Sequence, residues 1–194
     1  MPLIITHPET NPEIRKLEHE IAEKKAALAK LIQAEKGKEI QEYTFLDKNN
    51  ISISLAELFG TKTELIIVFY MGIKCKYCTL WADNYNGISA PLNNRAAFAV
   101  ISHETPDEQT KIKASRNWNF EMYSRMNNSF AQDLGFADSK NSPSPGIASF
   151  SLKGDKIFIH HRTLFGPGDN YCNMWDFINI LPSGLNDWQP KYNY

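Results

Sequence analysis

The chain has 194 residues, of which 42% are hydrophobic and 22% are charged, and its 21 Lys and Arg residues oppose 22 Asp and Glu residues. This composition is globular, and a net charge of −1 excludes a protein held to nucleic acid or to an anionic membrane by bulk charge. Three cysteines, Cys75, Cys78 and Cys172, are too few for a disulfide-stapled secreted scaffold. The longest nearly apolar run, residues 65–73, is too short to span a membrane. With no recognisable leader peptide, the chain is expected in the cytoplasm.

The first predicted element is a long helix that begins at Pro12 and ends before Gly37, with Asn11 as its N-cap. Its apolar residues are spaced by three and four and therefore form one stripe: Ile14, Leu17, Ile21, Leu28 and Leu31. The helix either lies across its own domain or pairs with a second copy of the chain as a short coiled coil, which Lys24 in the seam would weaken. We assign residues 1–40 to an N-terminal helical extension.

Beyond residue 40 the pattern alternates between strands and helices. Continuous β-branched and aromatic runs predict buried strands over residues 64–71 and 96–102, and shorter strands are expected over 43–46 and 120–124. Helices are expected over residues 54–60, 75–87, 105–117, 129–134 and 171–181, and Lys153-Gly154-Asp155-Lys156 joins a hairpin of residues 147–152 and 157–163. The sequence therefore predicts an α/β domain over residues 41–194, with a mixed sheet and helices on both faces.

Chemistry is concentrated in Cys75-Lys76-Tyr77-Cys78, which follows a buried strand and opens a helix. A thiolate at a helix N-terminus meets unpaired backbone N–H groups and the positive end of the helix dipole, which lower its pKa. The spacing of three residues brings Cys78 to the same helix face, close enough to form a disulfide. Lys74 and Lys76 add positive charge that favours the thiolate. We therefore expect Cys75 to attack a substrate disulfide and Cys78, one turn deeper, to resolve the mixed disulfide.

Three other interpretations compete with this one. The pair could be half of a zinc site, but a zinc site needs four ligands, and Cys172, His103, His160 and His161 have no spacing that indicates one. The pair could be a static disulfide, which a cytosolic location disfavours, or an inert pair of thiols. We expect no metal and no bound organic cofactor, with electrons supplied by a protein or small-molecule thiol.

Residues 75–87, with the sequence C-K-Y-C-T-L-W-A-D-N-Y-N-G, resemble the C-x-x-C-x-x-W-A-D-N-[FY]-[DN]-G signature of a bacterial thioredoxin-like family of unassigned function. That family is similar in fold to thioredoxin and to the alkyl-hydroperoxide-reductase group. The likeness extends through residues 99–102, 118–120, 133–136 and 154–155 to the aromatic C-terminal helix, and it includes the leading helix. The resemblance implies a thioredoxin-like fold, but it implies no particular reaction because the family's own reaction is unassigned.

The chain departs from two better-known patterns. Thioredoxins carry Trp before the first cysteine and Gly-Pro between the pair, where this chain has Lys74 and Lys76-Tyr77. The potential and partners of thioredoxin therefore do not carry over, and stabilisation of the thiolate by the lysines indicates a more oxidising pair. A peroxiredoxin-like site needs P-x-x-x-[TS]-x-x-C. With Cys78 as the reactive thiol, the matching positions are Met71 and Cys75, so a peroxiredoxin-like peroxidase is the weaker alternative.

Residues near the cysteine pair are candidates for substrate-side or supporting roles: Lys74, Lys76, Tyr77, Trp81, Asp83 and Pro145. We expect Trp81 to pack in the core, and the less favoured alternative is that it forms a wall on the substrate side. Asp83 is either a hydrogen-bonded aspartate, which we favour, or a buried acid that helps to deprotonate Cys78. Pro145 is the nearest candidate for the cis-proline of thioredoxin-like folds, although a loop proline is the favoured interpretation.

His103 ends a buried strand, where the sites of such sheets gather, and is a candidate for the edge of the site. Cys172 is expected to pack in the last helix as a small hydrophobic residue. The sequence thus predicts a thiol–disulfide oxidoreductase that acts on protein or small-molecule thiols and disulfides and binds neither nucleic acid nor membrane. The alternative from another class is a non-catalytic binding or assembly module on the same fold.

Overall fold

The computed structural model describes residues 6–126 and 128–194. The chain divides into two compact units, Met1–Gly37 and Lys38–Tyr194. The sequence places this boundary after residue 40, whereas residues 38–40 form strand β1, which pairs with strand β8 of the second unit. Among the residues described, no helix is long and apolar enough to cross a membrane.

The first unit is built on helix α1, Pro12–Ala34, which confirms the predicted capping pattern. The Glu13 backbone N–H donates to Asn11 Oδ1 over 2.8 Å, and Pro12 occupies the first helical position, where a missing N–H costs nothing. No residue of α1 is buried. The predicted apolar stripe is between 50% and 68% exposed at every position: Ile14, Leu17, Ile21, Leu28 and Leu31.

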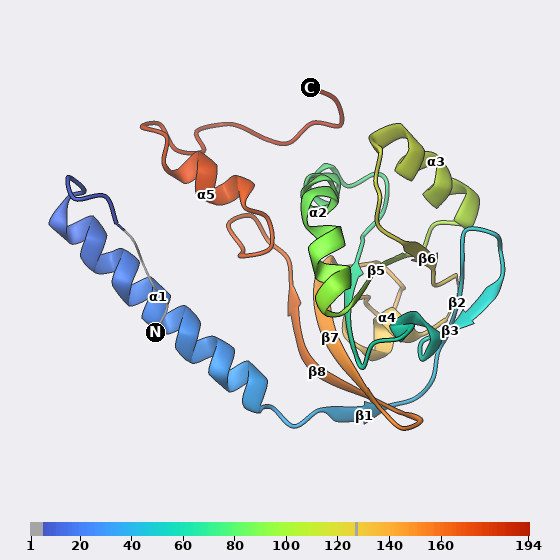
Figure 1. The fold of residues 1–194 in the computed structure, drawn as a ribbon. Helices are drawn as coiled ribbons and strands as arrows, with labels where there is room; N and C mark the ends of the chain where they lie inside the picture. Colours follow the sequence, from blue (N-terminus) through green and yellow to red (C-terminus); the bar gives the residue numbers. More distant parts are fainter. Residues whose placement is uncertain (1–5, 127) are drawn as a thin grey trace. The chain divides into compact units, whose positions relative to one another are not determined.

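The second unit is built on one mixed sheet of eight strands in the order β1-β8-β7-β4-β5-β6-β2-β3, counted over the residues described (Figure 1). The strands are β1 Lys38–Ile40, β2 Thr44–Leu46, β3 Ser52–Ser54, β4 Glu64–Phe69, β5 Ala97–Ser102, β6 Met122–Ser124, β7 Gly146–Lys153 and β8 Lys156–Leu164. Strand β5 pairs in parallel with β4 and with β6, whereas β4 pairs antiparallel with β7. The central strands are continuous apolar runs because both of their faces are covered.

Helices cover both faces of this sheet, as the sequence predicts. They are α2 Lys76–Arg95, α3 Pro106–Arg116, α4 Phe130–Asp133, α5 Met174–Asn179 and the short 3₁₀-helix Glu57–Phe59. On one face, α4 and the 3₁₀-helix pack against Leu65, Ile67 and Phe69 of β4. On the other, α2 and the segment around Trp175 pack against Val68 of β4, together with β5 and β6. The two cores lie on opposite faces of the central strands β4 and β5.

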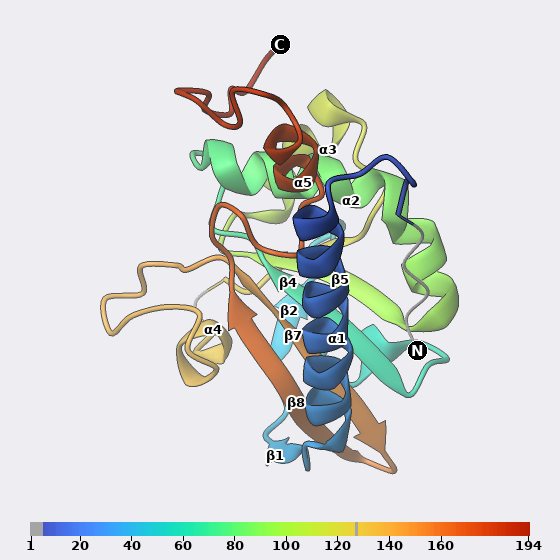
Figure 2. The same ribbon diagram turned by 90° about the vertical axis from the view of Figure 1, so that its left-hand side faces the viewer.

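One antiparallel side of the sheet is formed by the hairpin of β7 and β8, with β1 beside β8 at the edge (Figure 2). The turn between the two strands places Gly154 at a φ of 64°, a conformation that glycine adopts without strain, which agrees with the predicted hairpin. The register shifts between Ser149 and Phe150, at an irregularity of the ladder. This hairpin closes one side of the sheet and places Pro145 just ahead of β7.

The structure also corrects two expectations about the elements. Helix α2 was predicted to end near Gly87, but it continues through Pro91 to Arg95. The buried Ser89 and half-buried Leu92 hold the last turns against the core, which offsets the helical hydrogen bond that Pro91 cannot donate. The last helix is also shorter than expected, since α5 spans only Met174–Asn179. Cys172 therefore lies ahead of the helix and not inside it.

Candidate functional site

Cys75 is the N-cap of α2, at the end of the loop that follows β4. The backbone N–H of Cys78 donates to Cys75 Sγ over 3.1 Å, so the sulfur takes the place that a serine or aspartate oxygen fills in an ordinary N-cap. The Cys75 N–H in turn donates to the Gly72 carbonyl over 3.0 Å. Cys75 is half-buried, Cys78 is 3% exposed, and neither forms a disulfide in the structure. The more accessible thiol therefore lies at the start of the helix.

The two thiols have opposite acidities. A hydrogen bond from the Cys78 side chain, opposed by burial and assisted by the backbone N–H groups of Cys78 and Tyr77, lowers the pKa of Cys75 to about 7. The same hydrogen bond, followed by burial and the charge of Cys75, raises the pKa of Cys78 far above its ordinary value. Lys74 and Lys76, which the sequence predicts to favour the thiolate, are not among the causes of the Cys75 shift. Both residues are exposed, where solvent screens their charge, and Lys76 lies 5.9 Å from the ring centre of Tyr192.

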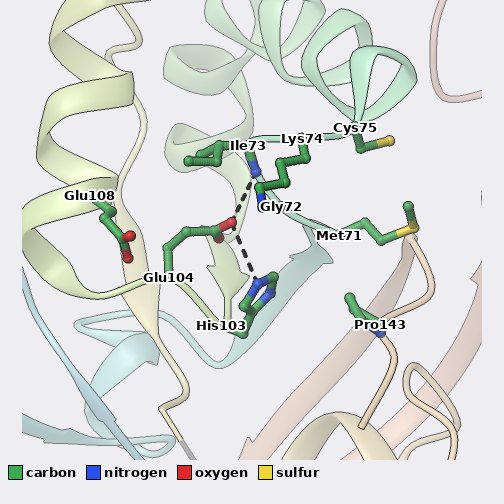
Figure 3. A pocket seen from close by; sticks show the side chains of 9 residues that line it. All are labelled: Met71, Gly72, Ile73, Lys74, Cys75, His103, Glu104, Glu108 and Pro143. Atoms are coloured by element: carbon green, nitrogen blue, oxygen red, sulfur yellow. Dashed lines mark hydrogen bonds and ion pairs between the residues drawn. The ribbon is translucent and has the colours of Figure 1, made fainter.

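Cys75 opens onto a cleft of about 440 Å³ between the end of β4, the end of β5 and the start of α3 (Figure 3). Its lining combines apolar and charged side chains: Met71, Gly72, Ile73, Lys74, Cys75, His103, Glu104, Glu108 and Pro143. A cleft of this size accommodates a small molecule, and the carboxyl ends of parallel strands are where such sheets form their sites. His103, expected at the edge of the site, lies in this lining.

Glu104 ties the loop before Cys75 to the end of β5. Its Oε1 accepts the backbone N–H of Ile73 over 2.9 Å, and its side chain is 5% exposed. Gly72 has a φ of 132°, and a Cβ on it would lie 2.7 Å from Glu104 Oε1 and 2.8 Å from His103 Cε1. The loop can therefore approach Glu104 only with glycine at this position. Through Gly72 and Ile73, Glu104 helps to set the position of Cys75.

The aromatic residues of α2 lie on the side of the pair away from this cleft. Trp81 is 3% exposed, stacks on Phe165 with ring centres 5.6 Å apart, and donates from Nε1 to both oxygens of Asp169. Tyr77 is half-buried and stacks on Trp175 with ring centres 6.3 Å apart. Trp81 therefore packs in the core and holds the chain around Asp169, where the backbone N–H groups of Gly166 and Tyr171 also donate.

Asp83 and Asn86 anchor α2 to the end of α3 and to the chain that follows it. Asp83 Oδ1 accepts from Arg116 Nε and from Trp118 Nε1, each over 2.8 Å, and Arg116 Nη2 forms an ion pair with Oδ2. Asn86 accepts the Asn119 N–H and donates to the Asn117 carbonyl, both over 2.8 Å. Both oxygens of Asp83 accept hydrogen bonds in this way. This geometry fits the first of the two predicted roles, a hydrogen-bonded aspartate, and not a proton acceptor for Cys78.

Pro145 lies beside Cys78 and Trp81 in the lining of a small internal cavity, and its peptide bond is trans. Its carbonyl accepts the Phe165 N–H over 2.9 Å. Cys172 is 1% exposed, and burial raises the pKa of its thiol. No three His, Cys, Asp or Glu side chains of the described part of the chain gather as metal ligands.

Two residues of this region were not identified from the sequence. Glu104 follows β5 directly, and the only available signal was its place at the carboxyl end of a parallel strand. Asp169 follows Gly166-Pro167-Gly168, which reads as a turn and gives no sign of a partner 88 residues away. Both contacts join segments that only the fold brings together.

These features define an α/β protein of thioredoxin-like fold with a cysteine pair at the start of a helix. The sequence matches none of the curated proteins. Among solved structures, it is similar to the peroxidoxin BcpB of Mycobacterium tuberculosis, at 15% identity and a TM-score of 0.56, over 74% of this chain and 92% of that one. It is also similar to peroxiredoxin Q of Xanthomonas campestris, at 13% identity and a TM-score of 0.55, over 70% and 85% of the two chains. A peroxiredoxin-like protein of Aquifex aeolicus is similar at 15% identity and a TM-score of 0.52, over 66% and 74%.

At these identities the similarity establishes the fold alone. Residues 9–194 match the model of a family described as bacterial protein of unknown function (DUF899). The chain belongs to this family. The match covers α1 as well as the sheet, so the leading helix is part of the family's sequence and not an appended segment.

Proposed function

We propose that the protein is a thiol–disulfide oxidoreductase in which Cys75 attacks and Cys78 resolves. The observation that carries this proposal is the hydrogen bond from the Cys78 N–H to Cys75 Sγ, at a thiol that lines a cleft and has a pKa of about 7. A thiol with a pKa near the ambient pH combines a large thiolate fraction with good nucleophilicity. We place the reaction in the cytoplasm, where a reduced pair is maintained.

In the first step, Cys75 Sγ attacks one sulfur of a substrate disulfide, and the substrate S–S bond breaks as the new S–S bond forms. One substrate thiolate leaves. Cys78 then gives its proton to this first thiolate and attacks Cys75 Sγ. The bond between Cys75 and the substrate breaks, the second substrate sulfur leaves as a thiolate, and the Cys75–Cys78 disulfide forms. The substrate gains two electrons and the protein loses two.

The resolving step is favoured by a change in charge. The hydrogen bond to the Cys75 thiolate and the charge of that thiolate raise the pKa of Cys78. Both causes disappear once Cys75 is part of a mixed disulfide, and only burial still opposes ionisation of Cys78. Cys78 therefore becomes a better nucleophile at the moment when it is required, and it stays protonated before that.

The test is the reduction of insulin disulfides by dithiothreitol with and without the protein. We expect the protein to accelerate precipitation of the insulin B chain, and we expect Cys75→Ser and Cys78→Ser to abolish the acceleration. Cys172→Ser, which alters a buried thiol outside the cleft, is the matched control and should retain it. Equal activity of Cys75→Ser and the unaltered protein would favour the non-catalytic binding module.

A peroxidase reaction is the second candidate, because the similar solved structures are named as peroxiredoxins. In this chain the reacting thiol would be Cys75, since Cys78 is 3% exposed and has a raised pKa. Consumption of hydrogen peroxide by the reduced protein, faster than by the Cys75→Ser variant, would support it. An unchanged peroxide concentration would exclude it.

A further inference from the structure

His103 brings a second functional group into the cleft that Cys75 lines. It is the first residue after β5, and the cleft lies between the end of this strand and the start of α2. Figure 3 shows the imidazole on the β5 side of the cleft and Cys75 on the α2 side. The His103 side chain is 46% exposed, so a molecule in the cleft can touch it. The two-cysteine reaction leaves this side chain without a role.

The imidazole packs against the loop that leads to Cys75. A Cβ on Gly72 would lie 2.8 Å from His103 Cε1, so the ring occupies space that any other residue at that position would need. Nε2 lies 3.7 Å from Glu104 Oε1, which is an ion-pair distance and longer than a hydrogen bond. Within the described part of the chain, neither ring nitrogen of His103 forms a hydrogen bond. An N–H of the ring is therefore free to donate to a molecule in the cleft.

Disulfide exchange places the departing sulfur at a distance from the attacking one. Cys75 Sγ approaches in line with the substrate S–S bond, so the departing sulfur is about 4 Å from Cys75 Sγ, two S–S bond lengths. A group that stabilises the departing sulfur must therefore lie across the cleft from Cys75 and not beside it. His103 lies on that side, and it is not among the causes that lower the pKa of Cys75.

We propose that His103 is a further catalytic residue, which donates a hydrogen bond to the departing sulfur in the first step. The inference rests on the proposed function, because this sulfur belongs to the disulfide that Cys75 attacks. As Cys75 Sγ bonds to the nearer sulfur, the electron pair of the substrate S–S bond goes to the farther sulfur, where negative charge develops. The N–H of His103 stabilises this charge without transferring its proton, and the departing thiolate takes its proton from Cys78.

The experiment uses Cys78→Ser, in which the reaction stops at the mixed disulfide, and compares two uncharged disulfides. Bis(2-hydroxyethyl) disulfide releases a basic alkyl thiolate, whereas 4,4′-dithiodipyridine releases a weakly basic aromatic thiolate that departs readily without help. In this background we expect His103→Ala to slow adduct formation on Cys75 about tenfold with the alkyl disulfide, the effect of one hydrogen bond to a charged atom. The rate with the aromatic disulfide should stay within about twofold.

Two further variants accompany this comparison. His103→Gln keeps an N–H donor at a similar distance and should recover part of the rate with the alkyl disulfide. His19→Ala, at an exposed position of α1, is the matched control and should react as Cys78→Ser alone does. Alkylation of Cys75 by iodoacetamide should titrate at the same pH in His103→Ala and in Cys78→Ser alone, because His103 is not a cause of the lowered pKa.

Equal slowing of His103→Ala with both disulfides would indicate a displaced loop and would overturn the inference. An unchanged rate with the alkyl disulfide would overturn it as well. Either result leaves the proposed function standing, because Cys75 still forms the mixed disulfide. If Cys78→Ser forms an adduct on Cys75 with neither disulfide, the proposed function fails and this inference with it.

Discussion

Cys75 and Cys78 share one environment and acquire opposite acidities from it. The spacing of the two cysteines predicts that both lie on one face at the start of a helix, and the structure has Cys75 as the N-cap. The sequence also attributed the activation of Cys75 to the helix start and to two lysines. The largest cause is instead the hydrogen bond from the Cys78 side chain, which depends on side-chain rotamers that spacing does not define.

Removal of the Cys78 thiol should therefore raise the pKa of Cys75. In Cys78→Ala the largest cause of the lowered pKa is lost, and the pKa should move from about 7 towards its ordinary value of 9.0. Cys78→Ser keeps a hydroxyl donor and should move it less. The pH dependence of iodoacetamide alkylation measures both midpoints. An unchanged midpoint in Cys78→Ala would show that the hydrogen bond is not the cause.

At the scale of the element, helix α2 is held by the signature residues that follow the cysteines. Trp81 binds Asp169, Asp83 binds Arg116 and Trp118, and Asn86 binds the segment around Asn119. These contacts attach α2 to two distant parts of the chain. Most of the signature therefore supports the position of the helix, and only its first residues reach the thiols.

Asp83→Ala should destabilise the protein without changing the chemistry of the pair. The change leaves the indole N–H of Trp118 and the guanidinium of Arg116 without their acceptor, at a cost of about 1–3 kcal/mol. Urea unfolding of the variant measures this loss, and alkylation of Cys75 should still titrate near pH 7. Asp155→Ala, in the exposed hairpin turn, is the matched control. A raised pKa of Cys75 in Asp83→Ala would instead indicate a direct role of Asp83.

The apolar stripe of α1 stays a prediction of self-association. The exposed residues Ile14, Leu17, Ile21, Leu28 and Leu31 repeat at the a and d spacing of a coiled coil, with Lys24 in one d position. Glu20 and Lys25 flank the seam with opposite charges, which suits a second copy of the same helix. Sedimentation equilibrium should therefore show a dimer at micromolar concentration. Ile21→Lys should dissociate it, Ala29→Lys outside the seam should not, and a monomer throughout would refute the prediction.

For the whole molecule, the sequence was sufficient for the fold class and for most of the elements. Some elements can be predicted from a few neighbouring residues, such as the continuous apolar strands β4 and β5 and the capping box of Thr105 and Glu108. The edge strands β1 and β3 were missed, whereas the equally short β2 and β6 were expected from their apolar and aromatic residues; β1 and β3 are mostly polar and are strands only through their partners. The cleft could not be predicted for a similar reason, since Glu104 meets Ile73 across 31 residues of chain.

The stability of the reduced protein should depend on pH through the cysteine pair. Both thiols titrate near 9.0 in the unfolded chain, but the pKa of folded Cys75 is about 7 and that of folded Cys78 lies above its ordinary value. Between these two pH values the unfolded chain binds more protons than the folded chain, so the free energy of unfolding rises with pH. Above about pH 9 the folded chain binds more, because Cys78 stays protonated, and stability falls again.

Urea unfolding under a phosphine reductant, compared between the protein and its Cys75→Ser, Cys78→Ser variant, isolates this contribution. The difference in the free energy of unfolding should increase from neutral pH to a maximum near pH 9. A difference that stays constant over this range would contradict the opposite shifts of the two thiols.

The assignment of Cys75 as the attacking thiol and Cys78 as the resolving thiol is tested most directly by trapping the mixed disulfide. Cys78→Ser is reacted with bis(2-hydroxyethyl) disulfide, and the adduct is located by mass spectrometry of its peptides. We predict one stable mercaptoethanol adduct on Cys75 and none on Cys172, while the unaltered protein proceeds to the Cys75–Cys78 disulfide. Absence of the adduct from Cys75 in Cys78→Ser, or equally fast formation of an adduct on Cys78 in Cys75→Ser, would contradict the mechanism.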